Sequence, residues 1–139
     1  MTTVVVDASV AAKWFLPEPG AEAALRLLDG RRRLVAPDLI GAEVGNILWK
    51  LHARKLLAAA EAAEIVEHFL SMPLEIHDSA FLLAPALEIA VATGRTVHDS
   101  LYLALAVELD ATVITADQRW ANALKPTPFT RFIRALVQP

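Results

Sequence analysis

The sequence contains no cysteine. The 139-residue chain therefore cannot form a disulfide framework, and it cannot bind zinc or an iron–sulfur cluster through thiolates. Its four histidines show no spacing typical of metal ligands, so a zinc site is not expected. The absence of cysteine agrees with a reducing compartment, and we expect the protein to act in the cytoplasm.

Targeting and membrane-spanning features are also missing from the sequence. The N-terminus has no basic region, and Asp7 interrupts its short apolar stretch, so no signal peptide is predicted. No uncharged apolar run approaches the roughly 20 residues that a helix needs to span a bilayer. The sequence has no internal repeat, linker or low-complexity segment, and its length suits one domain over residues 1–139.

The net charge of the molecule argues against nucleic-acid binding, whereas its local groups of basic residues are compatible with it. The formal net charge is −3, so the protein is not an obvious nucleic-acid binder. Basic residues gather at 31–33, at 50–55 and in the tail at Lys125, Arg131 and Arg134, either as solvated surface or as contacts to a nucleic-acid backbone. Hydrophobic residues make up 55 %, which indicates either a surface covered by a partner or an alanine-rich helical protein.

Hydrophobic periodicity predicts strands that alternate with helices. Strands are expected at about 2–6, 33–36, 74–76 and 112–115, and helices at about 8–15, 21–29, 38–54, 58–70, 80–93, 98–109 and 117–124. This alternation is typical of an α/β fold with a parallel sheet. The tail from residue 125 fits either a last helix or a packed extended segment.

Four acidic residues fall where such a fold brings distant segments together. Asp7 and Asp117 come just after predicted strands, Asp99 opens a buried helix, and Glu43 lies on the flank of an earlier helix. Ligands of open parallel sheets bind in the crevice beyond the carboxyl ends of the strands. Because clustered carboxylates repel one another unless a cation lies among them, this pattern predicts an oxygen-ligand site for Mg²⁺ or Mn²⁺.

Each acidic residue also has a purely structural explanation. Asp7 and Asp117 are good N-cap residues, and Asp99 suits the first turn of a helix capped by Thr96. Glu43 is different, because it shares with Asn46 and Lys50 a polar strip at the edge of an apolar helix face. Two hydroxyls, Ser9 and Thr115, lie two residues from Asp7 and Asp117, where they either orient the carboxylates or bond locally to the backbone.

Four segments together give the chain a resemblance to a known family. They are Val4-Val5-Val6-Asp7-Ala8-Ser9-Val10, Pro37-Asp38-Leu39-Ile40-Gly41-Ala42-Glu43-Val44-Gly45-Asn46, His98-Asp99-Ser100-Leu101-Tyr102-Leu103-Ala104-Leu105-Ala106 and Val113-Ile114-Thr115-Ala116-Asp117. In order and spacing they resemble the PIN-domain ribonucleases, and in particular the VapC toxins of bacterial toxin–antitoxin modules. The resemblance extends from residue 1 to about residue 124.

The resemblance implies a PIN-like three-layer α/β fold, with a parallel sheet of about five strands flanked by helices. Only four strands are predicted from the sequence, so the fifth must come from the tail. It further implies an Mg²⁺- or Mn²⁺-dependent endoribonuclease, with Asp7, Asp99 and Asp117 as direct or water-mediated metal ligands. Glu43 would be a ligand or would position the attacking water, while Ser9, Asn46 and Thr115 would support them.

The same resemblance implies an RNA substrate and a VapB-like antitoxin as partner, and the apolar composition leads us to expect a homodimer. We expect the antitoxin to dock near Trp14, Phe15 and Leu16, unless these side chains pack into the core. Two other functions stay open. A receiver-type phosphoacceptor domain shares the length and the strand-end aspartate, but Asp7 lacks its usual acidic neighbour. A PIN-like module that binds without catalysis is the other, although all four acidic residues are present.

Overall fold

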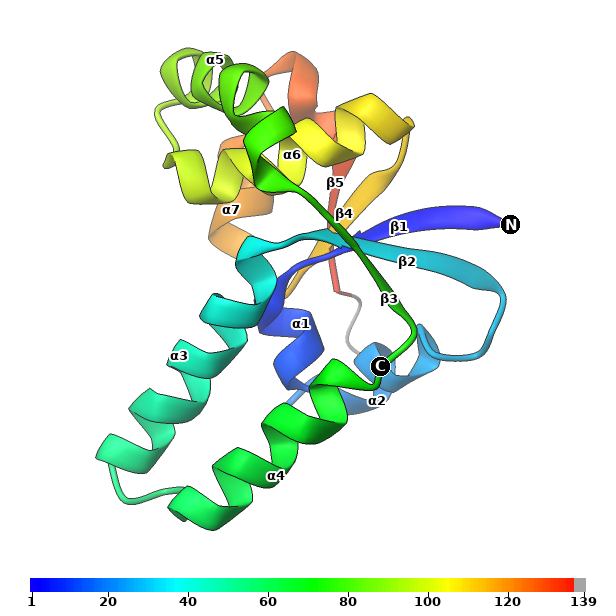
Figure 1. Ribbon diagram of the computed structural model, residues 1–139. Coiled ribbons are helices and arrows are strands. Elements are labelled where there is room, and N and C mark those ends of the chain that lie inside the picture. Colours follow the sequence, from blue (N-terminus) through cyan, green and yellow to red (C-terminus); the bar gives the residue numbers. More distant parts are fainter. Residues whose placement is uncertain (137–139) are drawn as a thin grey trace.

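A computed structural model describes residues 1–136, which contain a five-stranded sheet with helices on both faces (Figure 1). The strands are β1 (Thr2–Val6), β2 (Arg32–Pro37), β3 (Leu74–His77), β4 (Thr112–Thr115) and β5 (Ile133–Ala135). The α-helices are α1 (Ala8–Ala12), α2 (Ala21–Arg26), α3 (Leu39–Ala53), α4 (Ala59–Leu70), α5 (Leu83–Thr93), α6 (Val97–Leu109) and α7 (Gln118–Ala123). Two 3₁₀ helices, η1 (Ser79–Leu82) and η2 (Pro128–Phe132), precede α5 and β5. The predicted α/β fold class is confirmed.

The order of the strands fixes where a ligand can bind. All neighbours in the sheet are parallel, and their order is β3-β2-β1-β4-β5. The chain thus builds outward from β1 in one direction, then crosses back and continues from β4 in the other. In open α/β sheets the crevice at such a reversal is the usual ligand site. Here it opens beyond the carboxyl ends of β1 and β4.

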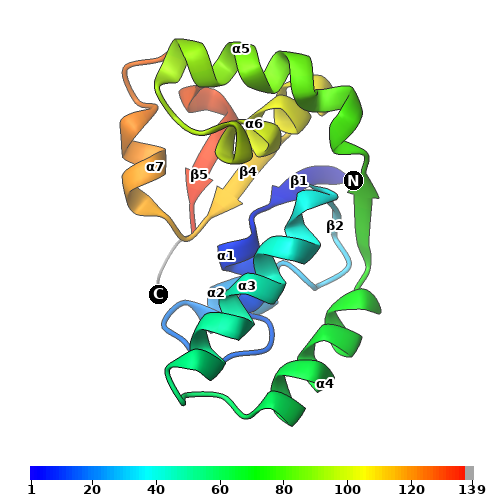
Figure 2. The same ribbon diagram turned by 60° about the vertical axis from the view of Figure 1, so that its left-hand side comes forward.

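The two faces of the sheet are covered by different helices, as Figure 1 and Figure 2 show. One face packs on α6, with α5 outside it, and the other packs on α1, α2 and α3. The segment Ser100–Ala106 of α6 is buried, as its all-round apolar sequence predicts. Within residues 1–136 no single helix is long and apolar enough to span a membrane; Ser79–Thr93 and Val97–Leu109 qualify only as a pair, bent by 114°.

Some element boundaries differ from the sequence prediction. The first helix ends at Ala12 rather than near Phe15, because residues 13–15 form tighter turns in which each N–H bonds to the carbonyl three residues earlier. The helix expected from residue 80 begins as the 3₁₀ segment η1. The tail supplies the missing fifth strand, which hydrogen-bonds to β4 at the sheet edge. That strand has three residues, too few for a clear sequence signal.

The expected antitoxin surface at residues 14–16 is only partly present. Trp14 and Leu16 are buried, and the Trp14 indole N–H donates to the carbonyl oxygen of Ala24 (2.9 Å). A buried indole with its polar atom satisfied belongs to the core, so the prediction was wrong for these two residues. Phe15 is half-buried and lines a pocket against α4 with Glu61, Glu64, Ile65 and His68.

The start of α6 is set by Thr96. Gly94 ends α5 with φ = 75°, in the left-handed region that favours glycine, so the chain turns sharply before α6. The Thr96 hydroxyl oxygen then accepts a hydrogen bond from the N–H of Asp99 (3.1 Å). This N-cap satisfies a backbone donor and fixes the direction in which the Asp99 side chain leaves the helix.

Replacing Thr96 by alanine should lower the free energy of unfolding by about 1 kcal/mol, since the cap is lost while little apolar contact changes. Thr96→Ser, which keeps the hydroxyl, should stay near wild type. Urea denaturation followed by circular dichroism measures both variants. An alanine variant as stable as the serine variant would contradict the capping role.

Candidate active site

The four acidic residues named from the sequence line one pocket at the crevice beyond β1 and β4. The pocket measures about 480 Å³. It contains Asp7 from the end of β1, Glu43 from α3, Asp99 from the first turn of α6 and Asp117 at the start of α7. Its other polar lining residues are Ser9, Asn46, Lys50 and His98. The structure therefore brings together the acidic set and the polar strip of α3, although the chemical roles assigned to them stay predictions.

Hydroxyl groups hold the Asp7 carboxylate between two strands. Ser9 Oγ (2.9 Å) and Thr115 Oγ1 (2.5 Å) both donate to Asp7 Oδ2. The same hydroxyl oxygens accept from the backbone N–H groups of Ala116 (3.1 Å, to Ser9) and Asp117 (3.0 Å, to Thr115). Each hydroxyl thus does both things that the sequence analysis allowed: it bonds to the backbone and it orients a carboxylate. Thr115 does this from a buried position beside the pocket.

Glu43 is held by a residue that the sequence analysis did not single out. The Tyr102 hydroxyl donates to Glu43 Oε1 (2.5 Å), and burial raises the pKa of Tyr102 far above its usual range, so this phenol stays protonated as a donor. Tyr102 is the only tyrosine in the chain. Its position one helical turn after Asp99 was the available signal, because residues three apart share a helix face.

The pocket raises the pKa of two of its carboxyl groups. Burial raises the pKa of Asp7, against the hydrogen bonds from Thr115 and Ser9, and the Asp99 charge adds to the increase. Burial also raises the pKa of Glu43, helped by the charges of Asp7 and Asp99. The folded protein therefore holds these protons more tightly than the unfolded chain does, and ionisation near neutral pH costs folding free energy. Lowering the pH or adding a cation relieves that cost.

Arg95 supplies positive charge to the site. Arg95 donates from Nε (3.2 Å) and Nη2 (2.9 Å) to Asp99 Oδ2, and its Nη2 lies 3.8 Å from Asp117 Oδ2. The sequence analysis did not select Arg95, because it lies in the turn before α6 rather than on an element. Its spacing of four residues before Asp99 was the only hint.

The four carboxylates of the pocket suit a hard cation, but their positions in this structure do not form a complete binding site for one. Carboxylate oxygens are the ligands that Mg²⁺ and Mn²⁺ prefer, and the raised pKa values of Asp7 and Glu43 reflect charge that a cation would neutralise. Among residues 1–136, however, no three acidic or histidine side chains lie close enough to share one ion. Arg95 occupies the space between Asp99 and Asp117, so a metal would have to displace its guanidinium group.

Comparisons with known proteins identify the family to which this chain belongs. The profile of the PIN domain matches residues 4–125. Ribonuclease VapC3 of Pyrobaculum aerophilum is 36 % identical over 121 residues, which cover 86 % of this chain and 92 % of that protein.

Two solved structures share the fold at low sequence identity. A toxin–antitoxin complex from Klebsiella pneumoniae has a TM-score of 0.69 at 13 % identity, covering 98 % of this chain and 99 % of that one. VapC20 of Mycobacterium tuberculosis, a toxin that cleaves the sarcin-ricin loop, has a TM-score of 0.68 at 17 % identity, with the same coverage. Since the family profile spans the whole acidic constellation, from before Asp7 to beyond Asp117, this chain belongs to the PIN domain family.

Proposed function

We propose that this protein is an endoribonuclease and the toxin component of a type II toxin–antitoxin system. The observation that carries the proposal is the pocket of four acidic residues at the strand-order reversal of a PIN-domain chain. The similarity to a protein named as a VapC ribonuclease supports it. Membership of this family does not favour a receiver-type phosphoacceptor. A reducing cytoplasm, where a cysteine-free chain loses nothing, is the proposed place of action.

We further propose that cleavage depends on Mg²⁺ or Mn²⁺. Asp7, Asp99 and Asp117 would hold the ion directly or through water, and Glu43 would be a ligand or would position the attacking water. A bound divalent cation lowers the pKa of water and stabilises negative charge on a phosphate. Asp7 and Glu43 are suited to their roles because hydroxyl groups orient both: Ser9 and Thr115 for Asp7, and Tyr102 for Glu43.

Arg95 has a separate role in this proposal. In the metal-free protein its guanidinium group partly neutralises Asp99 and Asp117. If Asp99 and Asp117 held a cation, Arg95 would no longer be needed to neutralise them but would stay beside the pocket, because its backbone lies directly before Thr96, the capping residue of α6. A freed guanidinium group there suits a phosphate oxygen of the RNA, since its planar fork binds phosphates in a bidentate manner. Lys50 and Asn46 offer further polar contacts at the pocket wall.

We propose a VapB-like antitoxin as the protein partner. A solved structure that shares this fold is a toxin–antitoxin complex, which supports the proposal. The pocket between Phe15 and α4 is a suitable docking place because Phe15 and Ile65 give it apolar walls while Glu61 and Glu64 add negative charge. An amphipathic helix with basic residues fits that combination. This moves the expected contact from Trp14 and Leu16 to Phe15 and α4.

We also propose that the protein forms a homodimer through η1 and α5. These elements form the outermost layer of the fold in Figure 1 and Figure 2, yet they expose large apolar side chains. Phe81 is 82 % exposed and Val91 79 %, with Leu83 and Leu87 between them. Several large exposed apolar side chains on one outer layer are typical of a surface that a partner covers.

Replacing Asp7 by asparagine should abolish metal-dependent RNA cleavage while the fold persists, because one ligand charge is lost and the amide oxygen can still accept from Ser9 and Thr115. Gel analysis of structured RNA incubated with Mg²⁺, Mn²⁺ or EDTA measures the activity. Glu67→Gln, at an exposed carboxylate of α4 outside the pocket, serves as the control and should cleave normally. Full cleavage by a folded Asp7→Asn protein would remove Asp7 from the site.

Replacing Arg95 by glutamine should lower the melting temperature in EDTA, because Asp99 and Asp117 lose their internal cation. It should also enlarge the rise in melting temperature that Mg²⁺ or Mn²⁺ causes, since the metal no longer has to displace a guanidinium group. Differential scanning calorimetry with and without metal tests both effects. Arg119→Gln, at an exposed position of α7, is the matched control. Equal metal responses in the two variants would show that Arg95 does not compete for the site.

The double substitution Leu87→Glu/Val91→Glu should convert the protein to a monomer, because two charges cannot be buried in an apolar interface without partners. Leu56→Glu, which changes an exposed leucine in the α3–α4 connection, should leave the dimer intact. Light scattering after gel filtration gives the mass of each species. If the wild-type protein is a monomer, or if both variants remain dimers, η1 and α5 do not form the interface.

A further inference from the structure

A basic groove lies on the sheet face that carries α1 and α2, away from the acidic pocket. Two adjoining hollows of about 300 and 480 Å³ share Arg32, Ile114 and Arg134 as lining residues. The first is bounded by α2, and the second runs over the starts of β1 and β4. Together we call these hollows the arginine groove, since four arginines line them: Arg26, Arg32, Arg131 and Arg134.

The sequence of the strands explains why this part of the sheet is open. Side chains on a strand alternate between the two faces, so Thr2, Arg32 and Thr112 lie on the same face as Val4, Leu34 and Ile114. The apolar members of this set are buried. The polar members stand nearer the strand starts, which the short helix α2 does not cover. A polar surface therefore replaces the core at this end of the sheet.

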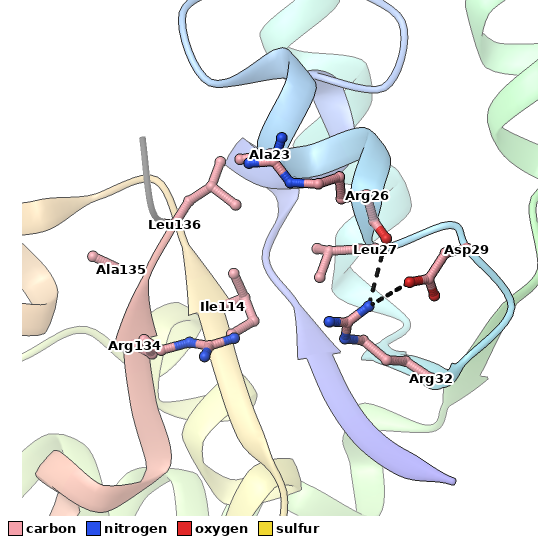
Figure 3. Close-up of a pocket in the computed structure, with 9 residues that line it drawn as sticks. All are labelled: Ala23, Arg26, Leu27, Asp29, Arg32, Ile114, Arg134, Ala135 and Leu136. Atoms are coloured by element: carbon pink, nitrogen blue, oxygen red, sulfur yellow. Dashed lines mark hydrogen bonds and ion pairs between the residues drawn. The ribbon is translucent and has the colours of Figure 1, made fainter. Parts of the chain in front are cut away.

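Two guanidinium groups face each other across the groove. Figure 3 shows Arg134 reaching from β5 over Ile114 toward β1, while the guanidinium group of Arg32 approaches from the other side of β1. Arg32 is bonded to the Asp29 carboxylate (3.2 Å). Within residues 1–136, neither Arg26 nor Arg134 has a side-chain ion pair. Like charges that face a shared hollow favour an anion between them.

We propose that the arginine groove binds the phosphate backbone of an RNA strand, at a site separate from the acidic pocket. Guanidinium groups bind phosphate oxygens in pairs, and the threonines at the strand starts add hydroxyl donors. The groove crosses four neighbouring strands, β2, β1, β4 and β5, and so suits a ligand with repeated negative charges rather than a single anion.

The need for such a site follows from the charge of the molecule. Affinity for a nucleic acid comes largely from contacts between basic residues and phosphates. The net charge of this protein is −3, and four carboxylates line the pocket where cleavage is proposed. A strand therefore gains little from the pocket itself until a cation is bound. Among the residues that line the groove, by contrast, four arginines accompany one acidic residue, Asp29. The identity of the polyanion as RNA rests on the proposed ribonuclease function.

The test is a binding measurement in EDTA, where metal-dependent cleavage is off and the acidic pocket repels phosphate. Fluorescence anisotropy of a labelled single-stranded RNA is followed for wild type, Arg32→Gln/Arg134→Gln and the control Arg54→Gln/Lys125→Gln. The control removes the same charge at exposed positions outside the groove. Loss of the two groove arginines should weaken binding about tenfold and reduce the slope of log K against log salt by about 1.4, or 0.7 for each phosphate contact.

Several outcomes would overturn the proposal. They are equal binding by wild type and the groove variant, an equal loss in the control, or displacement of the RNA by oligoglutamate of the same charge as readily as by unlabelled RNA. Cleavage in Mg²⁺ is measured separately. Groove-dependent binding without any cleavage refutes the ribonuclease function and leaves the groove assigned to RNA. Cleavage with unchanged binding by the groove variant refutes the groove alone.

Discussion

The anchoring of the Asp7 carboxylate between β1 and β4 is the constraint on which the rest of the structure depends. This carboxylate sits where the strand order reverses, and it accepts hydrogen bonds from Ser9 and Thr115. Those hydroxyl oxygens also accept hydrogen bonds from the backbone N–H groups that lead into α7, so the same network fixes the backbone position of Asp117. A change in the register of β4 would therefore displace two acidic residues at once. Fold and site are coupled through two hydroxyl groups.

The second constraint is the balance of charge around that anchor. Burial and neighbouring carboxylates raise the pKa of Asp7 and Glu43, so the metal-free pocket is under electrostatic strain. Arg95 relieves part of it by pairing with Asp99 and Asp117, and the Tyr102 phenol relieves another part by donating to Glu43. In the proposed metal-bound state a divalent cation would take over from Arg95 the neutralisation of Asp99 and Asp117, while Tyr102 would continue to orient Glu43.

The sequence predicts the elements that have a regular hydrophobic pattern and the residues that stand at the ends of those elements. The β-branched runs predicted β1 and β4, and the positions of Asp7, Asp99 and Asp117 at the ends of elements predicted one pocket. Tyr102 and Arg95 were not predicted, because the contact between Tyr102 and Glu43 spans 59 residues and Arg95 lies before α6, outside every predicted element. The strand β5 escaped because three residues carry no periodicity. Packing between distant segments decided the Tyr102 contact and the pairing of β5, while Arg95 pairs both with Asp99 four residues later and with Asp117.

The acidic pocket and the arginine groove lie at different parts of the same sheet. At the carboxyl ends, the reversal of strand order opens a crevice that acidic residues line, whereas the arginine groove lies on the face that carries α1 and α2. Arg32 and the threonines line it from the amino ends of the strands, and Arg134 lines it from β5, in register with Ile114. The crevice is thus lined by four carboxylates, while arginines outnumber carboxylates among the residues that line the groove. For a protein of net charge −3 this separation matters, because arginines of the groove placed within reach of the crevice would pair with its carboxylates, as Arg95 does. Within residues 1–136, Arg26 and Arg134 form no side-chain ion pair, while Arg32 and Arg131 pair with Asp29 and Asp110 rather than with the carboxylates of the crevice.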